Sequence, residues 1–152
     1  MENITKSIDV KVPVRTAYNQ WTQFEEFPRF MEGVEEVRQL DDKRLHWVAN
    51  IGGKREEWRA EITEQIPDKR IAWRTEEGAM NAGVVTFHHI DDNKTKVTLQ
   101  LDYKPESFTE KAGDMDGVLS RRVEGDLERF KDFIEQRGHE TGEWRGEIKK
   151  NK

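Results

Sequence analysis

Six segments between residues 34 and 103 alternate apolar with polar side chains, and short sequences rich in glycine, aspartate and proline separate them. Alternation with a period of two predicts β-strands that bury one face, and connections this short join antiparallel neighbours. In one of these segments Trp58, Ala60 and Ile62 alternate with charged residues. The chain is therefore constrained, above all, to form an antiparallel sheet with one apolar face.

One further strand and two short helices are predicted ahead of these six segments. Residues 4–12 alternate and end at a proline. Apolar residues then recur at helical spacing over residues 14–24, and Pro28 stops or kinks this helix because a proline disfavours the α conformation in the residue before it. The sequence "PRFME" indicates a second short helix with the proline in its first turn, closed by Gly33.

One long amphipathic helix is predicted after the strands, from about Gly113 to Arg137. A sheet with one apolar face needs a covering layer, and this helix has the length and the stripe to supply it. Gly138 is a typical C-terminal cap. The apolar stripe consists of Leu119, Val123, Leu127, Phe130 and Ile134.

The length of 152 residues suits a single domain, which we expect over residues 1–138. The apolar fraction of 34% is low, but five tryptophans and seven phenylalanines bury a large area per residue. The C-terminal tail, residues 139–152, has no sustained pattern. It is predicted to be mobile or packed only through Trp144.

Charge and composition exclude several classes of function. The net charge is −5 with acids and bases interspersed, so the basic patch of a nucleic-acid-binding protein is missing. Cysteine is absent, which excludes disulfides, a thiol nucleophile and cysteine-ligated zinc. The N-terminus lacks a secretory pattern, and no apolar run approaches the roughly 20 residues that span a bilayer. We expect a cytoplasmic protein without stable membrane insertion, either a monomer or a homodimer.

The order of elements and several local sequences resemble the START-like, or SRPBCC, superfamily, and within it the polyketide cyclase/dehydrase and coenzyme Q-binding group. The resemblance extends from about Ile4 to Arg137. Its most specific part is "VRTAYNQWTQFEEFPRFMEGVEEV", which resembles that group's helix, aromatic–Pro–x–aromatic turn and first hairpin strand. The stretches "WRAEITEQIPDKRIAWR", "KVTLQLDY" and "GDLERFKDFIE" also resemble segments of the group.

The resemblance implies an α+β protein with the helix-grip (START-like) fold. In this fold a bent antiparallel sheet wraps around a long C-terminal helix, with two short helices after the first strand. Such proteins enclose an elongated apolar cavity, which implies a lipid, an isoprenoid quinone or a polyketide-like compound as the ligand. Members differ widely in function, and fold does not imply function.

Candidate ligand-binding residues are the large apolar side chains of the helical pair, of the inward strand faces and of the start of the long helix. For each of them, simple core packing is the alternative. Three inward tryptophans on successive strands indicate a large space or flat surfaces for a ring or prenyl chain. The predicted set is Trp21, Phe24, Phe27, Phe30, Met31, Trp47, Trp58, Trp73, Phe87, Leu101, Tyr103, Met115 and Leu119.

Catalytic and metal-binding patterns are weak. Tyr103 and Glu56 are the catalytic candidates; the alternative for Tyr103 is a half-buried tyrosine with its hydroxyl in water. His88 and His89 point to opposite faces of a strand, so they do not easily share a metal ion. Neither a phosphate-binding loop nor a catalytic triad stands out. No metal and no cofactor are expected.

We therefore predict an intracellular, non-enzymatic protein that binds a hydrophobic small molecule for carriage or sequestration. One alternative is a polyketide cyclase or dehydratase that uses the same cavity, which a pocket group of perturbed pKa would favour. Another is an interaction or stress-associated protein with a vestigial cavity, which a large exposed apolar patch would favour.

Overall fold

The computed structural model describes residues 2–51, 53–78, 81–104 and 115–149. Seven strands form one antiparallel sheet in the order β1-β7-β6-β5-β4-β3-β2, so every strand pairs with its neighbour in the sequence except β1, which pairs with β7. The strands are β1 (Glu2–Val10), β2 (Val34–Gln39), β3 (Arg44–Ile51), β4 (Lys54–Ile66), β5 (Arg70–Gly78), β6 (Asn81–Asp91) and β7 (Lys94–Tyr103).

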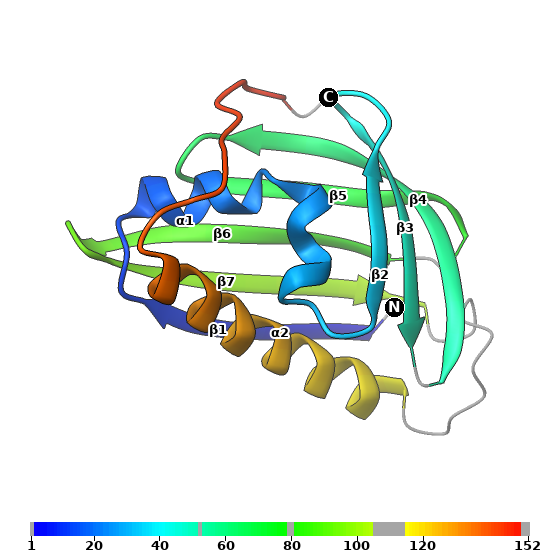
Figure 1. Cartoon of the computed structure of the whole chain (residues 1–152). Coiled ribbons are helices and arrows are strands. Elements are labelled where there is room, and N and C mark those ends of the chain that lie inside the picture. The colour runs from blue at the N-terminus through cyan, green and yellow to red at the C-terminus, as the bar shows by residue number, and fades with distance from the viewer. Residues whose placement is uncertain (1, 52, 79–80, 105–114, 150–152) are drawn as a thin grey trace.

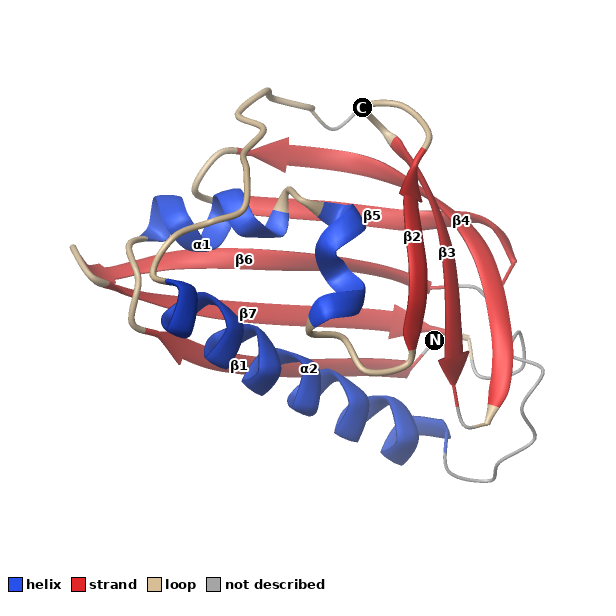
Figure 2. Ribbon diagram, viewed as in Figure 1, coloured by secondary structure: helices blue, strands red, loops and turns tan. Residues whose placement is uncertain are grey.

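The helices lie on the concave side of the sheet. Figure 1 shows the sheet curling around the long C-terminal helix α2 (Met115–Arg137), and Figure 2 shows that the two short helices lie on the same side. These are α1 (Val14–Trp21) and the 3-10 helix η1 (Phe24–Arg29). The predicted helix-grip architecture is therefore confirmed: a bent antiparallel sheet, a long C-terminal helix and two short helices after the first strand.

The boundaries of the short helices differ from the prediction. Helix α1 ends at Trp21, where the hydroxyl of Thr22 donates to the carbonyl of Asn19 (2.6 Å). Pro28 lies inside η1 rather than in the first turn of a second helix. Proline has no backbone N–H to donate. A short 3-10 helix contains few hydrogen bonds, so it tolerates the loss of one of them.

One of the glycine-containing stretches between the alternating segments belongs in part to a strand. Strand β6 begins at Asn81, and Gly83 pairs with Trp73 of β5 inside the sheet. The Trp73 ring lies over this glycine, where a larger residue would not fit. Local sequence does not reveal such a contact.

Aromatic rings form the centre of the core between α1, η1 and α2. The Trp21 ring contacts Phe130 of α2 with centroids 4.8 Å apart, and it also contacts Phe27, Phe30 and Phe87. Tilted and edge-to-face arrangements of this kind are favourable for aromatic pairs. The cluster fastens both short helices to α2 and to the sheet.

The C-terminal tail makes more contacts than the predicted one through Trp144. Gln20 of α1 is fully buried and exchanges two hydrogen bonds with Thr141. Ile148 is buried and pairs with Gln65 through both backbone hydrogen bonds. The sequence pattern did not indicate these contacts because most of them are polar or made by the backbone.

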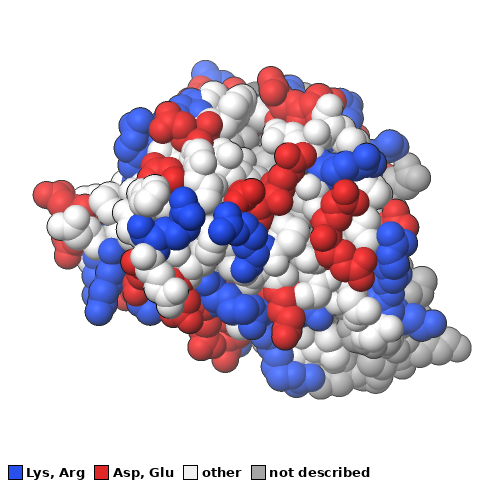
Figure 3. Space-filling view, viewed as in Figure 1, with Lys and Arg blue, Asp and Glu red and all other residues white. Residues whose placement is uncertain are grey.

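The surface carries charges of both signs. Figure 3 shows lysine, arginine, aspartate and glutamate interspersed over the face that bears the helices. In the part of the chain that the structure describes, no helix is long and apolar enough to cross a membrane.

Candidate functional site

Two small cavities lie between the concave face of the sheet and α2. The first, here called the Phe27 cavity, measures about 100 Å³ and is lined by Trp21, Phe24, Phe27, Met31, Leu45, Trp47, Ile62, Ile71, Trp73, Leu99, Asp126 and Leu127. The second, here called the Trp58 cavity, measures about 120 Å³ and is lined by Met31, Val34, Trp47, Ala49, Trp58, Trp73, Asn81, Leu101, Leu119, Arg122, Val123 and Asp126. Met31, Trp47, Trp73 and Asp126 line both, so the cavities are neighbours.

Trp47 and Trp58 form one wall of the Trp58 cavity. They are directly opposite each other on β3 and β4, and their rings stack with centroids 5.7 Å apart and an angle of 11° between planes. Both indole nitrogens are buried without a hydrogen-bond partner. A buried donor left unpaired costs about 1–3 kcal/mol, so these two N–H groups are unusual features of the interior.

Trp73 is held flat across the neighbouring strand. Its indole N–H donates to Oδ1 of Asn81 (3.3 Å). A Cβ atom on Gly83 would lie 2.5 Å from Cζ2 of Trp73 and 2.7 Å from the carbonyl oxygen of Gln100. Glycine at position 83 is therefore required for the ring to lie between the two cavities.

Replacement of Gly83 with alanine is expected to lower the free energy of unfolding by about 1–3 kcal/mol, because the new methyl group overlaps the Trp73 ring and a backbone oxygen. Urea denaturation followed by circular dichroism measures the loss. The displaced ring should also change the indole N–H resonance of Trp73 in an NMR spectrum. An unchanged stability and spectrum would show that the ring does not lie over Gly83.

Among the described residues, Asp126 of α2 is the one carboxylate on the walls of the two cavities. Its side chain is 13% exposed, and its Oδ1 accepts hydrogen bonds from the Arg129 guanidinium (2.6 Å) and from the backbone N–H of Glu32 (3.1 Å). Arg129 also donates through Nε to the carbonyl of Phe30 (3.0 Å). These bonds tie the segment that carries Met31 to α2.

Burial raises the pKa of the Asp126 carboxyl from 3.8 to about 6, although Arg129 and Arg122 oppose the change. A carboxyl with this pKa exchanges protons close to neutral pH, as a general acid or base must. Sequence reasoning missed Asp126. The available signal was its position beside Leu127, three residues after Val123, which places a charge at the margin of the apolar stripe.

Arg122 lies at the other side of the Trp58 cavity. Its guanidinium packs against Gly33, where a Cβ atom would be 2.5 Å from Nη1. Gly33 has a φ of +84°, so glycine is favoured there on conformational grounds as well. Arg122 is half-buried, and it forms neither a hydrogen bond nor an ion pair with any residue that the structure describes.

Most of the predicted ligand-binding residues line a cavity. Phe30, Phe87 and Tyr103 are buried but line neither cavity. Met115 begins α2, and its side chain lies outside the described part. The residues that do line a cavity are Trp21, Phe24, Phe27, Met31, Trp47, Trp58, Trp73, Leu101 and Leu119. Contact of any of them with a ligand remains a prediction.

Sequence reasoning did not propose the remaining lining residues. They are Val34, Leu45, Ala49, Ile62, Ile71, Asn81, Leu99, Arg122, Val123, Asp126 and Leu127. The aliphatic ones are inward strand residues or members of the α2 stripe, so periodicity alone placed them in the core without relating them to a cavity.

The catalytic candidates line neither cavity, although both lie beside residues that do. Glu56 is 5% exposed on β4 and lines neither cavity. Tyr103 is fully buried at the end of β7, so the alternative of a half-buried tyrosine with its hydroxyl in water is wrong. Its ring belongs to the apolar core, and its backbone pairs with both Glu2 and Asn81. Its role as a ligand contact stays a prediction.

His88 and His89 are adjacent, exposed residues of β6. Among the described residues, no group of three or more His, Asp or Glu side chains lies close enough together to hold a metal ion.

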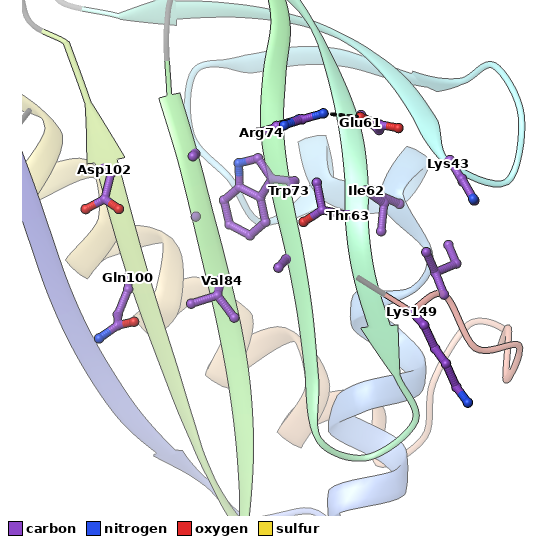
Figure 4. A pocket seen from close by; sticks show the side chains of 14 residues that line it. Lys43, Glu61, Ile62, Thr63, Trp73, Arg74, Val84, Gln100, Asp102 and Lys149 are labelled. Atoms are coloured by element: carbon purple, nitrogen blue, oxygen red, sulfur yellow. Dashed lines mark hydrogen bonds and ion pairs between the residues drawn. The ribbon is translucent and has the colours of Figure 1, made fainter. Parts of the chain in front are cut away.

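A larger hollow of about 400 Å³ lies on the sheet's convex face and is shown in Figure 4. Small side chains such as Ala72 and Ala82 lie among charged and polar ones, and Glu61 pairs with Arg74 (3.3 Å). A hollow lined this way does not favour an apolar ligand. The chemistry of interest therefore lies on the concave side, where the walls are aromatic and aliphatic.

A curled antiparallel sheet that holds a long C-terminal helix over internal cavities defines the helix-grip, or START-like, class. The chain belongs to the family described as polyketide cyclase/dehydrase and lipid transport, whose model matches residues 10–132. The predicted family is thereby confirmed.

Individual relatives agree with this assignment. An uncharacterized 17.2 kDa protein of Streptomyces lincolnensis is 59% identical over 149 residues, covering 97% of this chain and 99% of its own. A Deinococcus radiodurans protein of solved structure is 28% identical with a TM-score of 0.70, over 90% of this chain and 98% of its own. The Zhui aromatase/cyclase of a Streptomyces species has the same fold, with 17% identity and a TM-score of 0.76 over 94% and 99% of the two chains.

Proposed function

We propose that the protein binds a hydrophobic small molecule in the Phe27 and Trp58 cavities. The observation that supports this most is the pair of adjacent voids between aromatic walls. A solid interior beside Trp47 and Trp58 would have argued against a binding protein, and the Trp58 cavity lies beside both. Voids are few in well-packed domains, so two that share a wall are a reasonable binding site.

The volumes limit the size of the ligand. A dry apolar cavity of about 150 Å³ holds one benzene ring, whereas sites for drug-sized molecules are roughly 300–1,000 Å³. Each cavity here therefore suits about one ring or a short aliphatic segment. A ligand that occupies both must displace the side chains between them, and Met31 is the most adaptable of these.

Native mass spectrometry of protein purified from its own host, followed by organic extraction, tests the proposal. We expect a stoichiometric apolar compound or, for an empty protein, saturable quenching of tryptophan fluorescence by apolar ring compounds. Ala49→Leu fills part of the Trp58 cavity and should weaken binding while the protein stays folded by circular dichroism. Equal binding by this variant and the original protein would place the ligand elsewhere.

A second candidate function is a cyclase or dehydratase that acts on a polyketide-like chain. It is favoured by Asp126, a carboxyl with a pKa of about 6 on the wall of both cavities. An aromatase/cyclase shares the fold, although at 17% identity. With a polyketide-like substrate, Asp126→Asn should abolish turnover and leave binding intact. Unchanged turnover would contradict the enzymatic function and would favour carriage of the bound molecule.

The third prediction, an interaction protein with a vestigial cavity, gains no support. Leu40 and Ile90 are the large apolar side chains that the described part exposes, and they lie at the ends of different strands. Single exposed apolar residues are normal on protein surfaces.

A further inference from the structure

The Trp58 cavity has more hydrogen-bond donors than acceptors. The indole N–H groups of Trp47 and Trp58 are buried without partners. Arg122, which lines the same cavity, forms no hydrogen bond or ion pair within the described part. A guanidinium carries five N–H donors and no acceptor, so the wall presents several donors that the protein itself leaves unused.

Among the described residues, the charged side chains that line the cavity are Arg122 and Asp126. The Oδ1 of Asp126 is already paired with the Arg129 guanidinium at 2.6 Å. A buried carboxylate two residues from Trp58, that of Glu56, does not line the cavity. Arg122 acts on Asp126 only as a second, more distant positive charge that lowers its pKa. The cluster of Arg122, Asp126 and Arg129 thus contains two guanidinium groups and one carboxylate.

Such an arrangement is costly unless something else completes it. A half-buried cation is stabilised by an anionic partner, and guanidinium groups bind carboxylates through two parallel hydrogen bonds. Surface arginines often point into water without a partner, but Arg122 is packed against Gly33 at a cavity whose walls are mostly apolar. Its position therefore suits recognition of a group inside that cavity.

We infer that the ligand is an apolar molecule with a carboxylate, which Arg122 binds while its apolar part lies between the aromatic walls. This inference rests on the proposed binding function and specifies its ligand class. The indole N–H groups of Trp47 and Trp58 supply further donors to the carboxylate oxygens. A neutral or cationic ligand leaves Arg122 unpaired, and a dianion such as a phosphate monoester requires more positive charge than the wall offers.

Calorimetric titration at pH 7.5 with benzoate and its methyl ester tests the inference, because the pair differs in charge and has the same single ring. We expect the acid to bind the full-length protein at least about tenfold more tightly than the ester, the effect of one charge-assisted pair. Arg122→Met should remove this preference, so that the acid no longer binds more tightly than the ester. Arg121→Met, an exposed neighbour on α2, makes the same change in net charge and should preserve the preference.

Each outcome decides one of the two proposals. Equal affinity for acid and ester, or equal effects of Arg121→Met and Arg122→Met, would contradict the carboxylate inference and leave the binding proposal standing. Failure of both benzene compounds to bind would contradict the binding proposal and the inference together. Circular dichroism and thermal unfolding of Arg122→Met verify the fold, which should persist because Arg122 forms no hydrogen bond or ion pair with a described residue.

Discussion

Replacement of Trp21 with alanine is expected to lower the free energy of unfolding by about 3–5 kcal/mol, whereas the same change at Trp58 is expected to cost less than about 2 kcal/mol. Trp21 is 3% exposed and lies among the rings of Phe27, Phe30 and Phe130. Its removal leaves a large hole in a densely packed cluster. The surrounding helices cannot collapse into that hole without losing their own contacts.

Trp58 has a different environment. It is partly exposed and faces an existing void. Among the described residues, its ring contacts one other aromatic ring, that of Trp47. Its truncation enlarges that void, but it also removes a buried indole N–H that has no partner. Relief of the unpaired donor, about 1–3 kcal/mol, offsets part of the lost packing.

Urea denaturation followed by far-ultraviolet circular dichroism compares the two variants without relying on tryptophan fluorescence. Trp58→Phe serves as a control, since it keeps a ring against Trp47 and removes only the N–H; its stability should stay close to that of the original protein. Similar losses for Trp21→Ala and Trp58→Ala would mean that the Trp58 cavity is filled in solution and that Trp58 is ordinary core.

Replacement of Asp126 with asparagine is expected to raise stability at pH 7.5 by up to about 3 kcal/mol. The folded-state pKa is about 6 and the ordinary value is 3.8, so the folded protein holds the proton more tightly. Stability from the protonated carboxyl is fully present below pH 3.8 and is lost as the pH rises through about 6. A difference of about two pKa units corresponds to about 3 kcal/mol, an upper bound because the asparagine also loses the charge on the Arg129 hydrogen bond.

The measurement is the difference in unfolding free energy between Asp126→Asn and the original protein, taken from pH 4 to pH 7.5. The difference should be smallest at pH 4 and should grow in favour of the variant as the pH rises. Asp132→Asn, an exposed position on the same helix, should show no such trend. A variant less stable than the original protein at pH 7.5 would mean that pairing with Arg129 outweighs burial.

Periodicity was sufficient for most of the sheet and for the inward tryptophans. Each of the three strand tryptophans is an even number of residues away from buried neighbours on its own strand, which predicts that it points to the same face. All three, Trp47, Trp58 and Trp73, do lie on the concave face. Alternation works here because successive side chains of a strand must point to opposite faces whatever the strand packs against. The length of the predicted C-terminal helix and its apolar stripe likewise identified α2 as the helix that covers the sheet.

Arg122 and Asp126 could not be found in the same way. On a helix, residues at the margin of the apolar stripe point into the core or into solvent depending on how the helix crosses its partner layer. Asp126 was brought against the backbone of Glu32, and Arg122 against Gly33, by the crossing of α2 over the segment between η1 and β2. Neither segment is close to the other in the sequence.

By itself, the sequence determined the order of the elements along the chain, the apolar face of the sheet and the covering helix, because these depend on local periodicity and on short-range turns. The family was indicated by the resemblance of several local sequences. Only the tertiary structure decided that the aromatic side chains leave two cavities, that the tail packs on α1, and that one carboxylate and one unpaired guanidinium line the interior. Those features arise from the shapes of side chains brought together from distant parts of the chain, and the fit between such shapes has no periodic signature in the sequence.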